Sequence, residues 1–212
     1  MTQETLAKRE RKALAMLLDD LGPDAPTLCE GWTTRDLAAH LVVRENRPDA
    51  ALGLVATPLS GHMDRVRDDA SLREYDELVS TIASGPSRFS PFAFPGVDAL
   101  ANTAEYLVHH EDVRRAQPKW TVRDLDHADS TQIWRELPRY AAVTTRGLKV
   151  GLVAEHPDGR VQNLSKGTPV AVIAGEPLEI VLYLYGRRSV AKVELKGDPK
   201  AIAAVTGSEL SA

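Results

Sequence analysis

Apolar residues recur at helical spacing through the first two thirds of the chain. Leu14, Leu17, Leu18 and Leu21 lie three and four positions apart, which predicts a helix over residues 6–21 that ends at Gly22. The same spacing predicts helices over residues 33–56 with a break near Pro48, and over 71–82, 98–116 and 129–147. Thr33–Asp36 and Ser71–Glu74 have the form of capping boxes at two helix starts. These helices indicate an up-and-down bundle with a site between facing helices.

The pattern changes after Gly147. Short apolar runs predict strands over residues 148–154, 161–164, 170–174 and 190–195, with helices over 177–185 and 199–205. We therefore predict an α+β fold with a helical bundle over residues 1–147 and a small α/β domain over residues 148–212. The second domain is near the lower size for independent stability, so we expect it to pack on the bundle.

Composition and charge narrow the classes of partner. The chain has 212 residues, with 26 Lys and Arg against 30 Asp and Glu, which argues against binding nucleic acid or a membrane surface. Cys29 is the only cysteine, and no segment resembles a signal peptide or a membrane span. We expect a cytoplasmic protein with a small molecule or another protein as partner. The sequence does not indicate its oligomeric state.

Four residues suggest metal chemistry. Glu105 and His109 lie four positions apart on a predicted helix and share a face. Asp112 lies one turn further on and could accept a hydrogen bond from a metal-binding side chain. The alternative is an ordinary solvated Glu–His pair. His40 flanks an apolar stripe and is either a core residue or a third ligand, if its helix lies beside the helix of Glu105. His110 lies about 100° further round the helix and is a core, surface or substrate-facing residue.

Two motifs carry a family resemblance. The segment from Cys29 to Leu41 (CEGWTTRDLAAHL), followed by Glu105–Asp112 (EYLVHHED), resembles the metal-binding four-helix domain of mycothiol-dependent maleylpyruvate isomerase, in the DinB-like superfamily. The resemblance implies a divalent metal held by His40, Glu105 and His109. The metal is zinc in the isomerase member, and nickel, cobalt, iron or manganese also suit these ligands.

The resemblance extends to the second domain. Gly175–Arg188 and Gly197–Pro199 are similar to the C-terminal segment of the family, which has a sterol-carrier-like α/β fold and an arginine that assists the reaction. Arg187 matches that arginine, with Arg188 next to it, and would bind the carboxylate of the substrate or the cosubstrate. The alternative is that both are cations that satisfy the last carbonyls of a helix.

The resemblance also implies an activity. Three protein ligands leave one metal position open, where a thiol, mycothiol in this family, would be deprotonated. Asp112 or His110 would orient a ligand or transfer a proton. Cys29 is interpreted as a small apolar loop residue, with a nucleophile or a fourth metal ligand as the alternative. We expect a metal-dependent, mycothiol-linked isomerase or thiol S-transferase that acts on a small molecule. The alternative is a non-catalytic metal-containing binding or stress-response protein that carries a small apolar ligand.

Overall fold

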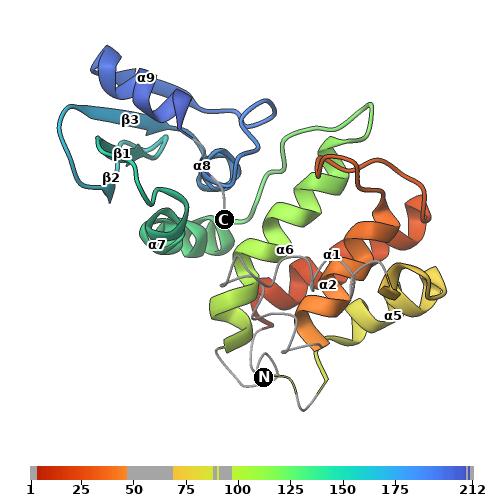
Figure 1. The fold of residues 1–212 in the computed structure, drawn as a ribbon. Helices are drawn as coiled ribbons and strands as arrows, with labels where there is room; N and C mark the ends of the chain where they lie inside the picture. Colours follow the sequence, from red (N-terminus) through yellow and green to blue (C-terminus); the bar gives the residue numbers. More distant parts are fainter. Residues whose placement is uncertain (1–3, 47–68, 88–89, 91–96, 209, 211–212) are drawn as a thin grey trace. The chain divides into compact units, whose positions relative to one another are not determined.

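The chain folds into two compact units, residues 1–121 (unit 1) and 122–212 (unit 2). The structure is a computed structural model, and it describes residues 4–46, 69–87, 90, 97–208 and 210 (Figure 1). Helices and a sheet are both present, so the predicted mixture of α and β structure is confirmed.

The described part of unit 1 is helical. It contains α1 (Leu6–Leu21), α2 (Thr34–Asn46), α5 (Tyr75–Ser84) and α6 (Val97–Arg115). Helix α1 packs against α6 and α5, and α2 packs against α5 (Figure 1). The core between them is apolar and includes Leu14, Leu18, Leu37, Leu41, Leu78, Ile82 and Tyr106. These residues come from all four of these helices, and their burial is the main stabilisation of the unit.

One of the two predicted helix starts is confirmed. The Asp36 carboxylate accepts hydrogen bonds from the backbone N–H and the hydroxyl of Thr33, both at 2.9 Å, which fixes the start of α2. The start predicted at Ser71 is wrong, because Ser71 ends an earlier helical segment and α5 begins at Tyr75 after the extended backbone of Glu74. Leu72 is consequently 84% exposed and lies outside the core. The predicted continuation of α2 to residue 56 lies outside the described residues.

Unit 2 is a four-stranded sheet with helices. Its strands are β1 (Gly151–Glu155), β2 (Val161–Ser165), β3 (Val170–Ala174) and β4 (Glu194–Gly197), in the order β2-β1-β3-β4. β1 pairs parallel with β3, and the two outer pairings are antiparallel. Its helices are α7 (His127–Thr144), α8 (Pro177–Leu184) and α9 (Pro199–Gly207). Helix α9 packs against β3 and β4, whereas α7 packs against α8 and β2 (Figure 1).

Helix α7 lies in unit 2, so the structure divides the chain before this helix, whereas the sequence analysis placed the boundary after it, at residue 147. The apolar face of α7 buries Ile133, Trp134 and Leu137. Gln162 in β2 donates a 2.7 Å hydrogen bond to the backbone carbonyl of Trp134. Helical periodicity shows that α7 has an apolar face, but it does not show which element covers that face.

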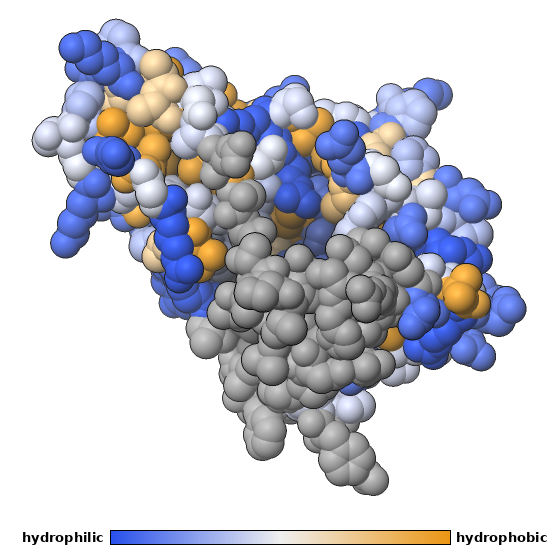
Figure 2. All heavy atoms as spheres, viewed as in Figure 1, coloured by the Kyte–Doolittle hydropathy of each residue, from blue (hydrophilic) through white to orange (hydrophobic). Residues whose placement is uncertain are grey.

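Large apolar side chains are exposed at scattered positions. Met16 is 69% exposed and Val161 is 62% exposed, and they belong to different units. On the face drawn in Figure 2, hydrophilic residues cover much of the coloured surface, with apolar residues in smaller groups between them. Scattered apolar residues of this kind are normal on a folded protein and do not identify a docking surface. Among the described helices, none has the length and apolar character needed to cross a membrane.

Candidate metal centre

The side chains of His40, Glu105 and His109 converge in unit 1. His40 Nε2 lies 3.2 Å from Glu105 Oε1, and His109 Nε2 lies 3.3 Å from the same oxygen. The donor atoms of the three residues all lie within 4.8 Å of one another. Each side chain is 12% to 18% exposed, so the group lies at the edge of the core rather than sealed inside it.

Local structure explains why these side chains meet. The capping box fixes the start of α2, so that Leu37 and Leu41 enter the core and His40 points along the margin of that apolar face. Glu105 and His109 are one turn apart on α6 and share a face. The sequence predicts this pair directly, whereas the approach of His40 depends on how α2 lies beside α6.

The second nitrogen of His109 is bound by Asp112. His109 Nδ1 lies 2.9 Å from Asp112 Oδ2, and the Asp112 side chain is fully buried. A carboxylate accepts hydrogen bonds, so the ring carries a proton on Nδ1, and Nε2 is the nitrogen that faces Glu105. Carboxylates hold metal-binding histidines in this way in many metal sites. The role of ligand orientation predicted for Asp112 is compatible with this position.

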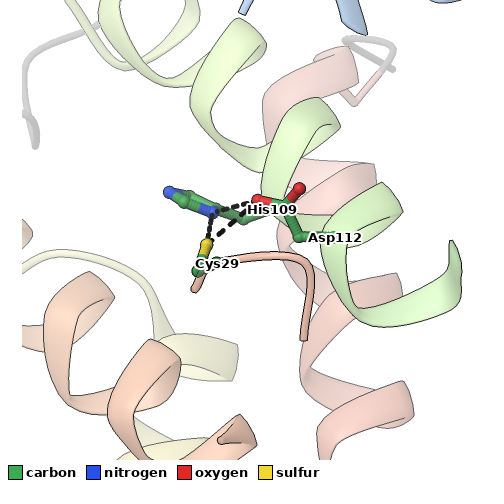
Figure 3. Close-up of side chains that lie close together, drawn as sticks. All are labelled: Cys29, His109 and Asp112. Carbon is green, nitrogen blue, oxygen red and sulfur yellow. Dashed lines mark hydrogen bonds and ion pairs between the residues drawn. The ribbon is translucent and has the colours of Figure 1, made fainter. Parts of the chain in front are cut away.

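Cys29 lies beside this pair, although the sequence analysis interpreted it as a small apolar residue. Figure 3 shows its sulfur facing His109 and Asp112, with Sγ 3.3 Å from Asp112 Oδ2 and 3.8 Å from His109 Nδ1. Its proximity in sequence to Trp32 and His40, within one motif, was the available signal. The contact itself joins residues 83 positions apart and cannot be read from spacing.

Arg44 is a further residue that sequence reasoning missed. It lies one turn after His40 on α2, and its Nε is 3.3 Å from Glu105 Oε1. Its guanidinium also donates to the side-chain oxygen of Asn102. One carboxylate oxygen therefore faces three nitrogens, from His40, His109 and Arg44.

The pKa values show how these groups act on one another. Burial alone raises the pKa of Glu105, but the charge of Arg44 and hydrogen bonds from His109 and His40 outweigh burial and hold it well below its usual value. Burial lowers the pKa of His40, and Glu105 offsets this only in part. Burial also lowers the pKa of His109, but Asp112, Cys29 and Glu105 raise it well above its usual value. The site therefore favours positive charge at the ring between Glu105 and Asp112.

His110 is not brought into this group. Its Nδ1 lies 2.8 Å from Glu10 Oε2 on α1, and both side chains are buried. Adjacent helical residues point about 100° apart. This rotation directs His110 toward α1, while His109 faces α2. A catalytic role for His110 stays a prediction.

The two predicted arginines lie in unit 2, after α8. Arg188 donates 2.6 Å hydrogen bonds to the carbonyls of Thr206 and Ser208, and its guanidinium lies over the Tyr183 ring. Arg187 donates a 2.6 Å hydrogen bond to the carbonyl of Tyr185, the C-cap residue of α8. These contacts match the helix-terminal alternative for both residues. Their role in binding a substrate or cosubstrate stays a prediction.

Comparisons with known proteins agree with the resemblance found in the sequence motifs. Residues 5–90 match the family described as the mycothiol maleylpyruvate isomerase N-terminal domain. The fold is similar to a crystal structure of the mycothiol-dependent maleylpyruvate isomerase, with a TM-score of 0.60, 18% identity and 91% of each chain covered. A histidine-to-alanine mutant of that isomerase gives a TM-score of 0.59 with the same identity and coverage.

No curated protein sequence matches the chain. At 18% identity, the two structures show that the fold is shared across most of the chain. The similarity to the family itself covers residues 5–90, which include the Cys29–Leu41 motif. Residues 5–90 of this chain are therefore similar to the mycothiol maleylpyruvate isomerase N-terminal domain family, over less than half of the 212 residues.

Proposed function

We propose that this protein is a metal-dependent enzyme that uses mycothiol in an isomerisation or thiol transfer on a small molecule. In this proposal His40, Glu105 and His109 bind a divalent metal. The observation that carries it is the convergence of His40 Nε2 and His109 Nε2 on one oxygen of Glu105, at 3.2 and 3.3 Å.

These distances suit metal ligands. With metal–ligand bonds of about 2.1 Å, tetrahedral geometry separates ligand atoms by about 3.4 Å. Charge-assisted hydrogen bonds are shorter, at about 2.7 to 2.9 Å. The contact of His109 with Asp112, at 2.9 Å, fits a hydrogen bond. The two contacts with Glu105 fit the spacing of ligands better.

The neighbouring residues support the same chemistry. Asp112 holds the proton on His109 Nδ1, so Nε2 is available as a ligand. The Trp32 ring lies 5.2 Å from the His40 ring and restricts its rotation. A bound divalent ion with an open position would lower the pKa of an entering thiol, which supplies a thiolate at neutral pH.

The choice of mycothiol and of isomerisation depends on the comparisons. The matched family is that of the mycothiol maleylpyruvate isomerase N-terminal domain, and both similar structures are of the mycothiol-dependent maleylpyruvate isomerase. Arg187, with Arg188 beside it, is the predicted partner for a carboxylate of the substrate or cosubstrate. Zinc is the first metal to test, and nickel, cobalt, iron and manganese suit the same donors.

The described residues do not favour the alternative of a carrier for an apolar ligand. A pocket of about 230 Å³ in unit 2 is lined by Arg123, Asp124, Glu176 and Glu179 together with apolar residues. Carrier sites for apolar molecules are lined predominantly by apolar side chains. The lining of this pocket mixes charged and apolar side chains and therefore gives no particular support to that function.

Elemental analysis of the purified protein tests the metal proposal. We expect near-stoichiometric divalent metal in the wild type and its loss in His40→Ala and in His109→Ala. His127→Ala is the matched control, because His127 is exposed at the first turn of α7 in unit 2. A wild type that contains no metal and takes up neither zinc nor nickel at neutral pH would disprove the proposal.

An activity assay tests the reaction separately. Metal-loaded protein is incubated with maleylpyruvate, with and without mycothiol, and the isomers are followed by NMR. We expect turnover only when mycothiol is present, and its loss in His109→Ala. A protein that binds metal but gives no thiol-dependent turnover of any tested unsaturated acid would be a metal protein of another class.

A further inference from the structure

The loop between α1 and α2 is anchored directly to α6. The Leu28 N–H donates a 3.0 Å hydrogen bond to the backbone carbonyl of Asp112. Within the loop, the Thr27 hydroxyl accepts from the Cys29 N–H at 3.2 Å and donates to the Trp32 carbonyl at 2.9 Å. Cys29 therefore lies on a constrained turn that is tied to the helix carrying His109.

Three distances define how Cys29, Asp112 and His109 interact. Asp112 Oδ2 is 2.9 Å from His109 Nδ1 and 3.3 Å from Cys29 Sγ, whereas the sulfur is 3.8 Å from Nδ1 (Figure 3). The imidazole therefore donates to the carboxylate rather than to the sulfur. The thiol proton also points to the carboxylate, because a thiol is a weak donor and Oδ2 is its nearest strong acceptor. One buried oxygen accepts both protons.

We propose that Cys29 is a positioning residue for the metal centre and acts through Asp112. Its thiol holds the Asp112 carboxylate in the rotamer that binds His109 Nδ1, which aims His109 Nε2 at Glu105 and His40. This inference deepens the proposed function, since it concerns the same three ligands. In this inference the Cys29 thiol donates to Asp112, and Asp112 in turn binds the metal ligand His109.

The position of the sulfur argues against two other roles. Cys29 contacts the ring on its Nδ1 edge, while Glu105 and His40 lie at the Nε2 edge. The imidazole thus stands between the sulfur and the point where the three ligands converge. A fourth ligand or a nucleophile would have to reach the opposite edge, so Cys29 is poorly placed for either.

The physical effect follows from the burial of Asp112. Its side chain is fully buried, so solvent is poorly placed to supply a replacement donor. Removal of the thiol leaves the shared oxygen with one donor fewer and permits the carboxylate and the ring to rotate. Loss of such an outer contact in a metal site typically weakens metal binding by about 10 to 100 fold.

The test compares Cys29→Ala, Cys29→Ser, Asp112→Asn and the Cys29→Ala/Asp112→Asn double variant. Zinc affinity is measured by chelator competition, and thermal unfolding of each variant monitors folding. We expect Cys29→Ala to lose about 10 fold in zinc affinity. Cys29→Ser keeps a donor and should retain most of that affinity. In the Asp112→Asn background, Cys29→Ala should have no further effect on zinc affinity.

The matched control is Glu30→Ala, a change at an exposed residue of the same loop that should leave zinc affinity unchanged.

A second readout does not depend on metal binding. The His109 Nδ1 proton is followed by NMR in metal-free protein, where it should be protected from exchange in the wild type and Cys29→Ser and exchange faster in Cys29→Ala. Equal protection in all three proteins would overturn the role of Cys29, as would a serine variant that behaves like the alanine variant in zinc binding. Loss of protection in Cys29→Ala, in a protein that binds no metal, would instead support the positioning role and refute the metal proposal.

Discussion

At the residue scale, the centre is a balance of charges around one carboxylate. Glu105 is the only carboxylate among the three proposed ligands, and Arg44 lies on the same oxygen as the two imidazoles. An arginine at this place offsets the desolvation penalty that a buried carboxylate would pay without a metal. Arg44 and a bound metal would therefore stabilise the same negative charge.

Replacement of Arg44 tests whether the guanidinium and a bound metal stabilise the same charge on Glu105. Arg44→Met breaks a buried ion pair, which we expect to lower the free energy of unfolding of the metal-free protein by about 3 to 5 kcal/mol. Saturating zinc should restore part of this loss, because the ion also neutralises Glu105. Urea unfolding with and without zinc measures both effects. The control is Arg73→Met in the exposed pair with Glu77, which should change stability by less than about 1 kcal/mol.

The separation in sequence between contacting residues explains which site residues could be predicted from the sequence. Glu105, His109 and Asp112 lie on one helix, so helical spacing alone places them together. His40 is 65 residues from Glu105, and only the family motif connected the two. Arg44 and Cys29 meet the site through tertiary packing and appeared in the sequence as an ordinary helical cation and a loop thiol.

At the element scale, the start of α2 connects local sequence to the site. The capping box of Thr33 and Asp36 fixes the first turn, and His40 follows within two turns. The helices predicted at α1, α2, α6 and α8 are confirmed. Helix α1 buries one apolar face, whereas all eight residues of α8 are buried. The box expected at Ser71 failed because Ser71 ends another helical segment and α5 begins only after Glu74, which a four-residue pattern cannot exclude.

Loss of this cap should affect both stability and metal binding. Asp36→Ala removes the acceptor for the Thr33 N–H, which we expect to cost about 1 kcal/mol of unfolding free energy. Fraying of the first turn should also weaken zinc binding through His40. The matched variant is Asp126→Ala, which removes the N-cap of α7 in unit 2. It should cost a similar amount of stability in unit 2 and leave zinc affinity unchanged, as measured by thermal unfolding and chelator competition.

At the scale of the whole molecule, the position of α7 decides where the chain can be divided. Its buried face contacts α8 and β2, so a cut after residue 147 would separate it from the elements that cover it. A cut between residues 121 and 122 keeps those contacts together. Periodicity alone could not distinguish these boundaries, because α7 is amphipathic like α1 and α5 of unit 1.

Two fragments test this boundary. We expect residues 122–212 to fold cooperatively, because they retain the full core of unit 2. Residues 148–212 lack α7 and leave the α8 and β2 surfaces uncovered, so they should be markedly less stable or unfolded. Circular dichroism and thermal unfolding of both fragments measure this difference. Equal stability of the two would show that α7 contributes little to unit 2.

The polar links between α2 and α6 have a consequence for local opening of the protein. His40 meets Glu105, and both Arg44 and Glu45 meet Asn102, so two helices far apart in sequence are joined by side chains. A metal ion bound by His40, Glu105 and His109 would add a further link between α2 and α6. Amide hydrogen exchange along α2 should therefore slow when zinc is added, while exchange along α8 stays the same. Metal binding would then change the amide exchange rates along α2, although this helix contributes only one of the proposed ligands.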